Sequence, residues 1–351
     1  MKLWPIFTCV TFLGGCSVSH TPSVASDQPT PAKVQMERGD LPEYDLADTI
    51  DGGLVSLGPN DEVVCALSQY GFTSVNATKL SWASFDIFSG PAFDQAKSWY
   101  LVKDRNSQPI QPNQFVNSDG ALVPIFDSPP IREHIDGQDV DLEALHAPTT
   151  KYRVYQSGTD VYVREAANPT LHILDKKPGA PSLLFKDDYM AISRSGSQVA
   201  SIVNLAQGNV SEMSVPSGYV KDFAPTGELL TREANHGSIV TKTGRTELSD
   251  GDPASLVTMG GKSVAIGSYL TDLSRGLCDL CVWNSKGEIV PLRILCPAVA
   301  EIFANRRIES YYVSARSNKR GTIAIQVSSY ATAGTGGSYQ ACQTLLLRPK
   351  K

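Results

Sequence analysis

One pattern returns along most of the chain: a turn that ends in glycine, one or two polar residues, and a short apolar run. It occurs as NSDGALVPI, QSGTDVYV, RSGSQVASI, PTGELL, GGKSVAI and KRGTIAI. Each run has the length, the β-branched content and the flanking turn residues of a β-strand. The pattern therefore predicts an all-β protein. The glycines that mark it are Gly120, Gly158, Gly196, Gly227, Gly261 and Gly321.

Successive marker glycines are separated by 38, 38, 31, 34 and 60 residues, and the last interval is close to two units. Between them, Ser-Lys-Gly at 285–287 and Thr-Gly-Arg at 243–245 suit hairpin turns. A unit of about 30–45 residues with several antiparallel strands is typical of a propeller blade. We expect one β-propeller of about six to eight blades over residues 44–349. A large β-sandwich, or a pair of them, is the alternative.

Helical patterns are few and short. PAFDQAKSW at 91–99, DLEALHA at 141–147 and PAVAEIFANRR at 297–307 each open with Pro or Asp, which favour helix starts. These segments predict a few short helical insertions between the strands.

The repeats resemble the HAF-type extracellular repeats. The likeness is carried by RSGSQVASI, GLCDLCVWNSKGEIVPL and GTIAIQVSSYATAGTGGSYQACQTLLLRP, within residues 110–348. That family pairs an Asn-x-x-Gly-x-aliphatic strand with an aliphatic-Trp-x-x-Gly-x-aliphatic hairpin. Asn117 matches the family's Asn, Ser193, Ala224 and Asn318 only approximate it, and the His-Ala-Phe triplet is absent. The resemblance implies a propeller and no particular activity.

The N-terminus resembles that of a bacterial lipoprotein. A short positive start is followed by an apolar run, Leu3 to Leu13, which is too short to span a bilayer. Leu13-Gly14-Gly15-Cys16 then resembles a lipobox. We expect residues 1–15 to be removed as a signal peptide and Cys16 to carry diacylglyceryl and palmitate. An ordinary secretory signal that contains Cys16 by chance is the alternative.

A lipidated Cys16 carries more than one acyl chain, which suffices for stable membrane anchoring. Residues 16–43 are rich in Ser, Thr, Pro, Ala and Gln, so we expect a flexible tether there. The lipoprotein resemblance implies that Asp after the lipidated Cys favours the inner membrane. Ser17 therefore points to the outer membrane, with the body of the protein in the periplasm or at the cell surface.

The charge balance excludes one class of partner. The chain has 31 Lys and Arg against 36 Asp and Glu, and removal of Lys2 with the signal peptide shifts the net charge from −5 to −6. A nucleic-acid-binding protein would carry a basic stripe. The basic residues here are scattered, so we expect no nucleic-acid partner.

The remaining cysteines are Cys65, Cys278, Cys281, Cys296 and Cys342. In an exported protein, pairing is the default expectation. If 285–287 is a hairpin turn, residues whose numbers add to about 572–574 face each other, which predicts a Cys278–Cys296 bridge. Cys65 and Cys342 lie near the two ends of the body, where a bridge would lock the ring. Cys278-x-x-Cys281 as a redox motif or half a zinc site is the alternative, although no second Cys-x-x-Cys or nearby His completes a zinc site.

The sequence offers no catalytic residue, metal site or cofactor site. Gly-Lys-Ser at 261–263 lacks the earlier glycine of a phosphate loop, and neither Gly-x-Ser-x-Gly nor His-Glu-x-x-His occurs. The five His residues are isolated in the sequence. The carboxylates between Asp136 and Glu143 are interpreted as a solvated turn leading into the helix predicted at 141–147, because Ala144 takes the place of a calcium-loop glycine.

Three functions remain open. We favour an outer-membrane-anchored propeller that binds or scaffolds an envelope protein, and we do not favour an enzyme. The first alternative is an envelope glycan or peptide hydrolase or lyase with carboxylates at the propeller axis. The second is an accessory subunit of an envelope secretion complex. Two or more carboxylates, or a His, gathered in a pocket of the central face would favour the enzyme, whereas a broad apolar or aromatic patch would favour the binding protein.

Overall fold

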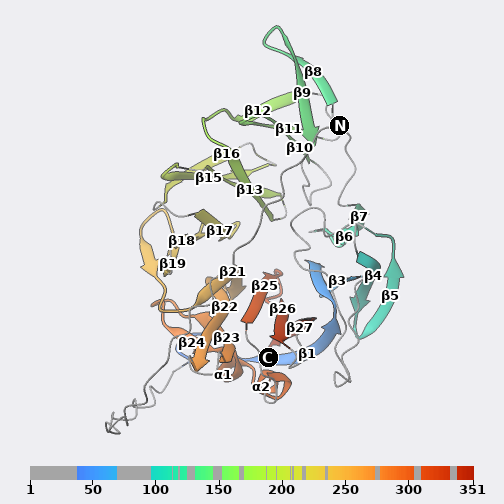
Figure 1. The fold of residues 1–351 in the computed structure, drawn as a ribbon, viewed down its shortest axis with the longest axis vertical. Coiled ribbons are helices and arrows are strands. Elements are labelled where there is room, and N and C mark those ends of the chain that lie inside the picture. The colour runs from blue at the N-terminus through green and yellow to red at the C-terminus, as the bar shows by residue number, and fades with distance from the viewer. Residues whose placement is uncertain are drawn as a thin grey trace, which may run out of the picture. The chain divides into compact units, whose positions relative to one another are not determined.

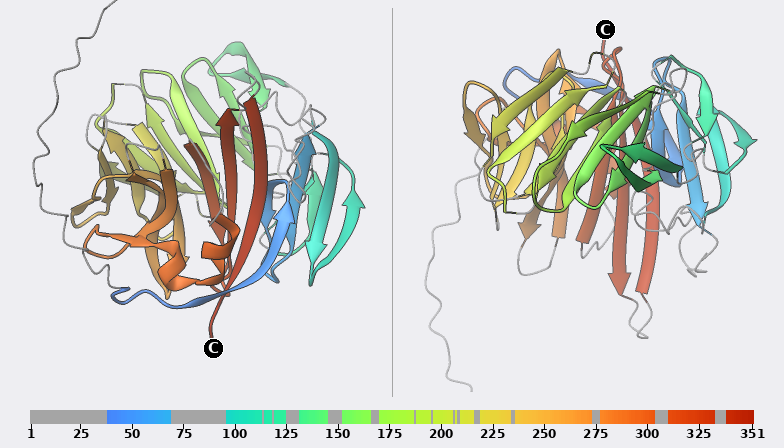
Figure 2. Two further views of the ribbon diagram at one scale, coloured as in Figure 1. Left: turned by 60° about the horizontal axis from the view of Figure 1, so that its bottom comes forward. Right: turned by 90° about the horizontal axis from the view of Figure 1, so that it is seen from above.

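The computed structural model describes residues 38–351 apart from 69–95, 113, 118, 125–130, 145–151, 166–169, 187, 195, 206, 208, 216–218, 234–235, 273–276, 304–309 and 333–337. In that part all elements are strands except two short helices, α1 (Leu292–Leu295) and α2 (Ala298–Phe303). The strands form seven antiparallel sheets that succeed one another along the chain, here called blades 1 to 7 (Figures 1 and 2).

Blades 1 to 3 come first and differ in size. Blade 1 consists of β2 (Gly53–Leu57), β3 (Val63–Ser68), β4 (Ala96–Lys103) and β5 (Asn106–Ile110). Over the described residues, blade 2 has two strands, β6 (Gln114–Val116) and β7 (Leu122–Pro124). Blade 3 has five strands, β8 (Ile131–Ile135), β9 (Gln138–Ala144), β10 (Tyr152–Ser157), β11 (Asp160–Glu165) and β12 (Leu171–Asp175).

Blades 4 to 6 are regular four-stranded meanders. Blade 4 consists of β13 (Pro181–Lys186), β14 (Tyr189–Arg194), β15 (Val199–Asn204) and β16 (Asn209–Ser214). Blade 5 consists of β17 (Tyr219–Phe223), β18 (Leu229–Glu233), β19 (His236–Val240) and β20 (Arg245–Glu247). Blade 6 consists of β21 (Asp252–Met259), β22 (Lys262–Asp272), β23 (Leu277–Trp283) and β24 (Ile289–Pro291).

Blade 7 joins the two ends of the body. β25 (Ser310–Ser317), β26 (Ile323–Thr332) and β27 (Ser338–Pro349) pair in order, and β1 (Tyr44–Asp51) is the fourth strand. β1 pairs antiparallel with β27, from Tyr44 opposite Pro349 to Asp51 opposite Gln343. The first strand of the chain thus completes the last blade. The predicted all-β propeller of six to eight blades is confirmed.

The hydrophobic core is divided among the blades. Six clusters of buried side chains each join two neighbouring blades, and a seventh lies within blade 3. Because most blades are covered on both faces, their strands are apolar runs rather than strict alternations. Representative buried residues at the six interfaces are Phe115 (blades 1–2), Met190 (3–4), Phe223 (4–5), Trp283 (5–6), Leu280 (6–7) and Leu346 (7–1).

Polar side chains fasten the first strands of the blades to one another. In blades 1, 5 and 6 a β-bulge precedes a Ser or Asp, and the bulge turns this side chain out of the regular alternation. Its oxygen then accepts a hydrogen bond from a backbone N–H of the next blade. Ser56 accepts from Val116 at 2.9 Å, Asp222 from Leu256 at 2.6 Å, and Ser255 from Ala315 at 3.0 Å.

The Asn-x-x-Gly turns have one hydrogen-bonding pattern. In the turns that begin at Asn117, Asn284 and Asn318, the side-chain oxygen accepts two backbone N–H groups at 2.8–3.1 Å. The glycine three residues later has a φ of +78° to +82°, which an L-residue rarely adopts. Asn and Gly therefore recur here because this turn geometry requires them.

The helix predictions were partly right. α2 lies within the predicted segment 297–307, which is confirmed. Residues 141–144 belong to β9, so the helix predicted at 141–147 is wrong over that part, and 145–147 lie outside the described residues. The helix predicted at 91–99 is wrong over Ala96 to Trp99, which belong to β4, and residues 91–95 lie outside the described residues. Short helical patterns are weak on their own, and pairing with β3 and β10 overrides them.

Candidate interaction surface

Two carboxylates on the first strands of blades 5 and 6 are neutralised by cations. Asp222 of β17 accepts hydrogen bonds from the Lys186 ammonium at 2.7 Å and from the Leu256 N–H at 2.6 Å. Asp252 of β21 accepts from Lys221 at 2.7 Å and from Arg232 at 2.6 Å. A catalytic acid or base needs a carboxylate that is available to a substrate. These two carboxylates serve instead to join blades 4, 5 and 6.

The acidic run at 136–143 lies on a hairpin. Asp136 and Gly137 both have left-handed φ values and form the two-residue turn between β8 and β9, so the run does not lead into a helix. Asp139 lies within 3.0 Å of His134 and 3.9 Å of Arg132 on the facing strand. Over the described residues no group of three or more His, Cys, Asp or Glu side chains is placed to hold a metal ion.

The described residues show neither of the two predicted disulfides. Cys65, Cys281 and Cys296 are buried and no disulfide of the described residues involves them, whereas the side chains of Cys278 and Cys342 lie outside the described residues. The hairpin register was predicted correctly, since Cys281 faces Pro291. However, β24 ends at that proline and α1 begins, which carries Cys296 away from β23. Cys65 lies on β3 of blade 1, whereas backbone pairing between β1 and β27 closes the ring.

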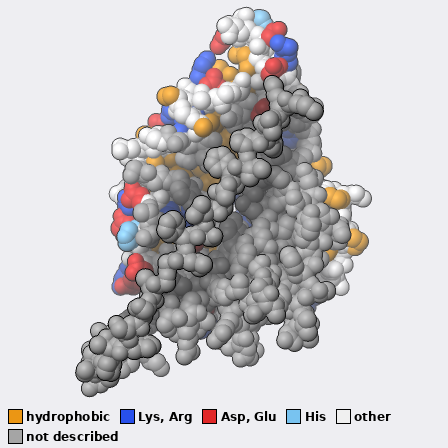
Figure 3. Space-filling model, in the orientation of Figure 1, with side chains coloured by type: hydrophobic (Ala, Val, Ile, Leu, Met, Phe, Trp, Pro, Cys, Tyr) orange, Lys and Arg blue, Asp and Glu red, His pale blue; other side chains and the backbone are white. Residues whose placement is uncertain are grey.

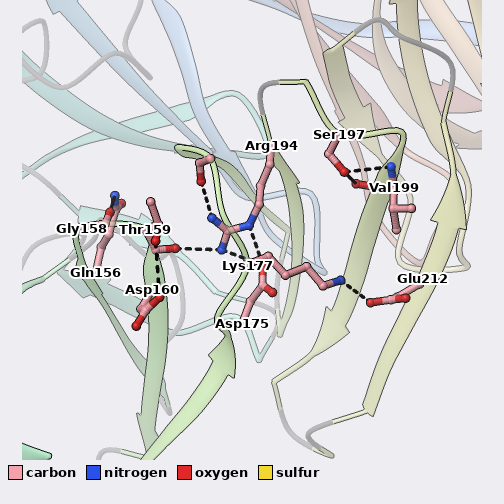
Figure 4. A network of polar contacts seen from close by, with 11 residues as sticks. Gln156, Gly158, Thr159, Asp160, Asp175, Lys177, Arg194, Ser197, Val199 and Glu212 are labelled. Atoms are coloured by element: carbon pink, nitrogen blue, oxygen red, sulfur yellow. Dashed lines mark hydrogen bonds and ion pairs between the residues drawn. The ribbon is translucent and has the colours of Figure 1, made fainter.

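A groove of about 350 Å³ lies between blades 3 and 4. Its apolar lining comes from Leu174 of β12, Ile192 of β14 and Val210 of β16. Lys176 and Lys177, which follow β12, and Glu212 of β16 add charged groups. Lys177 forms an ion pair with Glu212 across the groove (Figure 4). We call this site the blade 3–4 groove.

A buried ion pair fixes the two blades that form this groove. The Arg194 guanidinium at the end of β14 donates to the Asp175 carboxylate at 2.8 and 3.0 Å, and their side chains are only 3% and 9% exposed. Arg194 also donates to the backbone carbonyls of Gly179 and, at 2.8 Å, Thr159 (Figure 4). A buried charge without partners would be costly, so this full set of acceptors holds blade 3 against blade 4.

The outer part of blade 4 exposes apolar side chains beside the groove. Val210 is 48% exposed and Val199 is 39% exposed. Val199 faces Ser214, Ser201 faces Glu212 and Val203 faces Val210, so both exposed valines lie on the face that carries Ser201 and Glu212. In Figure 3, apolar side chains reach the surface in the upper part of the molecule, near charged ones. An exposed apolar face next to a charged groove is typical of a binding surface.

Sequence reasoning missed this surface. In VASIVN (199–204) and NVSEMS (209–214), valine appears in strand patterns that look like core. Which valines remain exposed depends on how blade 3 covers blade 4, and this is a tertiary property. The one available signal was Arg194 in an otherwise apolar strand, because a charged residue there needs a buried partner.

Comparisons with known proteins assign no family. No family model matches the chain, and no curated protein matches it. Among solved structures, a chain of the mitotic checkpoint complex is 10% identical, with 96% of this chain and 99% of that chain covered and a TM-score of 0.43. An essential surface component of the type-IX secretion system of Porphyromonas gingivalis is 11% identical. The match covers 84% of this chain and 33% of that chain, with a TM-score of 0.33. A dipeptidyl peptidase 4 of the same organism is 12% identical. The match covers 84% of this chain and 53% of that chain, with a TM-score of 0.34. The propeller assignment rests on the strand pairings described above, and these likenesses add nothing on function.

Proposed function

We propose that this protein is a lipid-anchored propeller of the cell envelope that binds a protein partner at the blade 3–4 groove. The exposed valines of blade 4 beside an apolar, charged groove carry the proposal. A segment that places an apolar side chain against Leu174 and Val210, with an acidic residue near Lys176, complements the groove in shape and charge.

The neutralised carboxylates favour binding over catalysis. Asp222 and Asp252 each contact two cationic or backbone donors and tie blades together. Four carboxylates, those of Asp45, Asp48, Asp61 and Asp104, do line a pocket of about 630 Å³ beside β1. Three of them lie within 3.9 Å of the Arg348 or Lys350 side chain, so this pocket too holds paired carboxylates. A binding or scaffolding role needs only a rigid body and an exposed surface, which the ring of blades supplies.

The anchor forms the second part of the proposal. Leu13-Gly14-Gly15-Cys16 supports lipidation of Cys16, and Ser17 supports residence in the outer membrane. Over the described residues no helix is long and apolar enough to cross a membrane. In wild type we expect a mature N-terminus at an acylated Cys16, and in Cys16→Ser an uncleaved precursor. Mass spectrometry of the wild-type N-terminus checks the anchor, and an unmodified N-terminus elsewhere would contradict it. Membrane fractionation tests the outer-membrane location separately.

Cross-linking in native membranes tests the partner. Wild type should yield a specific cross-linked protein, whose identity also shows whether the chain belongs to a secretion complex. A Val199→Asp and Val210→Asp variant places charges on the apolar face and should lower recovery of that protein roughly 30-fold, because central apolar contacts contribute about 2 kcal/mol or more.

The matched control is Ile294→Asp. Ile294 is 36% exposed and lies on α1, away from blades 3 and 4. The control should bind like wild type. If both variants bind the partner as wild type does, or if both lose it equally, the blade 3–4 groove is not the binding site.

A further inference from the structure

One face of the ring collects the tight turns. In a four-stranded antiparallel blade the first and third strands run in the same direction, so the turns that follow them lie on the same face. We call this the turn face. In blades 5 to 7 it carries the turns at 241–244, 260–261, 284–287 and 318–321, together with the end of β27.

Exposed cations gather on the turn face of these blades. They form what we call the basic sector: Lys242, Arg245, Lys262, Lys286, Lys319, Arg320, Lys350 and Lys351. The corresponding turns of blades 1, 2 and 4 and the first turn of blade 5 carry carboxylates: Asp61, Asp104, Asp119, Asp188 and Glu228. Arg105 lies beside Asp104 in the β4–β5 turn of blade 1. Eight of the 31 Lys and Arg residues therefore lie on one part of one face, in a chain of net charge −5.

Most of these cations have no carboxylate partner among the described residues. Lys262 pairs with Asp40, Lys350 with Glu43 and Arg245 with Glu233 and Glu247. Within the same part of the chain, no ion pair involves the others. Arg320 donates to the neutral Asn60 side chain at 2.8 Å. The cations without ion pairs are Lys242, Lys286, Lys319, Arg320 and Lys351.

The segment that precedes β1 lies on this sector. Asp40 pairs with Lys262, Pro42 lies beside Gly260, and Leu41 is buried in the cluster between blades 6 and 7. Residues 38–43 therefore bring the chain into the body next to the basic sector. If Cys16 is acylated, only residues 17–37 separate the lipid from this segment. A flexible chain of that length spans roughly 25 Å.

We propose that the basic sector docks on the anionic headgroups of a lipid surface. Each Lys or Arg near such a surface adds an increment of attraction, and the sum decreases as salt screens the charges. Docking would fix the turn face of blades 5 to 7 toward the membrane. The physiological role of this contact rests on the proposed anchor, but the attraction itself does not.

Vesicle binding by the chain from Ser17, which carries no acyl group, tests the proposal. The protein should co-sediment with vesicles of phosphatidylglycerol and phosphatidylcholine but not with phosphatidylcholine alone, and binding should weaken as salt is raised. Lys286→Glu with Lys319→Glu should lower the affinity at least about tenfold. The control, Arg132→Glu with Arg293→Glu, makes the same charge change on exposed residues of β8 and α1, outside the turns of the turn face, and should bind like wild type.

Three results would overturn the proposal: no preference for the anionic vesicles, equal losses in the two double variants, or stronger binding to soluble polyglutamate than to vesicles. The last result would assign the basic sector to an acidic protein. Because this experiment uses neither the acyl chain nor the blade 3–4 groove, its failure is distinguishable from failure of the proposed function.

Discussion

Tyr44 buries a hydroxyl group without a hydrogen-bond partner among the described residues. Its side chain is 1% exposed and lies in the cluster between blades 6 and 7. Burial raises the pKa of Tyr44 to about 12, so the phenol stays neutral. A buried hydroxyl that lacks a partner costs free energy, because water would have hydrogen-bonded to it in the unfolded chain.

Tyr44→Phe should therefore stabilise the fold by about 1 kcal/mol, since the ring stays and only the hydroxyl is removed. Urea unfolding followed by fluorescence measures this change. Tyr155→Phe is the matched control. Tyr155 is also 1% exposed, but its hydroxyl accepts a hydrogen bond from Arg164 at 3.1 Å, so its removal should destabilise. A loss of stability in both variants would contradict the prediction.

Single residues also show where sequence reasoning reaches its limit. The register of the 285–287 hairpin was predictable from its turn, and Cys281 does face Pro291. The predicted Cys278–Cys296 pairing had a local weakness. The sequence ILCPA at 294–298 contains no signal that strand pairing ends at Pro291 and that α1 begins at Leu292. Arg194 was visible as a charge in an apolar strand, but its partner Asp175 lies on another blade and no spacing rule identifies it.

At the scale of elements, the β2–β3 turn holds blade 1 against blade 7. Asp61 stands where the related turns have glycine and adopts a φ of +65°. Its carboxylate accepts hydrogen bonds from Asn318 and Arg348 of blade 7, each at 2.9 Å. Burial alone would raise the pKa of Asp61. Hydrogen bonds from Thr322 and Asn318 and the charge of Arg348 outweigh burial, so the pKa lies below its ordinary value of 3.8.

This lowered pKa makes the contact sensitive to acid. A carboxyl group with a lower pKa in the folded state contributes stability above its unfolded pKa, near 3.8, and loses that contribution as the pH falls through the folded value. Asp61→Asn should lower the free energy of unfolding at pH 7 by about 1–2 kcal/mol and reduce its decline below pH 4. Urea titrations across this range measure both effects. Asp104→Asn, at a 70% exposed carboxylate, should change neither, and an unaltered pH profile in Asp61→Asn would exclude the contact as a source of acid sensitivity.

Strands were more predictable than helices for a physical reason. A marker-glycine turn followed by β-branched residues specifies local geometry, as at Gly321 before β26, so the repeats identified most of the blades. The segment at 141–147 has helical spacing, but β10 supplies pairing for Ala144 that seven residues of helix could not match. The size of blade 2 was not predictable, because NSDG gives the same signal whether two or four strands surround it.

For the molecule as a whole, ring closure depends on one strand. β1 forms the outer strand of blade 7 and covers β27 over the length of its pairing. Removal of residues 1–51 would expose the unpaired backbone edge of β27, and such edges promote aggregation. This variant should unfold at a lower urea concentration and form soluble aggregates. Chromatography with light scattering, together with urea unfolding, measures both effects.

Removal of residues 1–35 is the control for this truncation. It leaves the compact unit from Met36 to Lys351, with β1, intact and should not alter the unfolding midpoint. If the two truncated proteins are equally stable and monomeric, closure by β1 contributes little to the fold. Neither variant tests the membrane anchor, since both lack Cys16.

The place of β1 also sets an order in time. Of the described strands β1 is made first, whereas its partner β27, up to Pro349, is made last. At about 5–20 residues per second, β1 waits for roughly 15–60 s without a partner while blades 1 to 6 can assemble on one another. A nascent chain interrupted anywhere before Gln343 lacks the partner of β1 altogether. Late truncation thus produces an open ring with two unpaired strands, which proteases can distinguish from the finished protein.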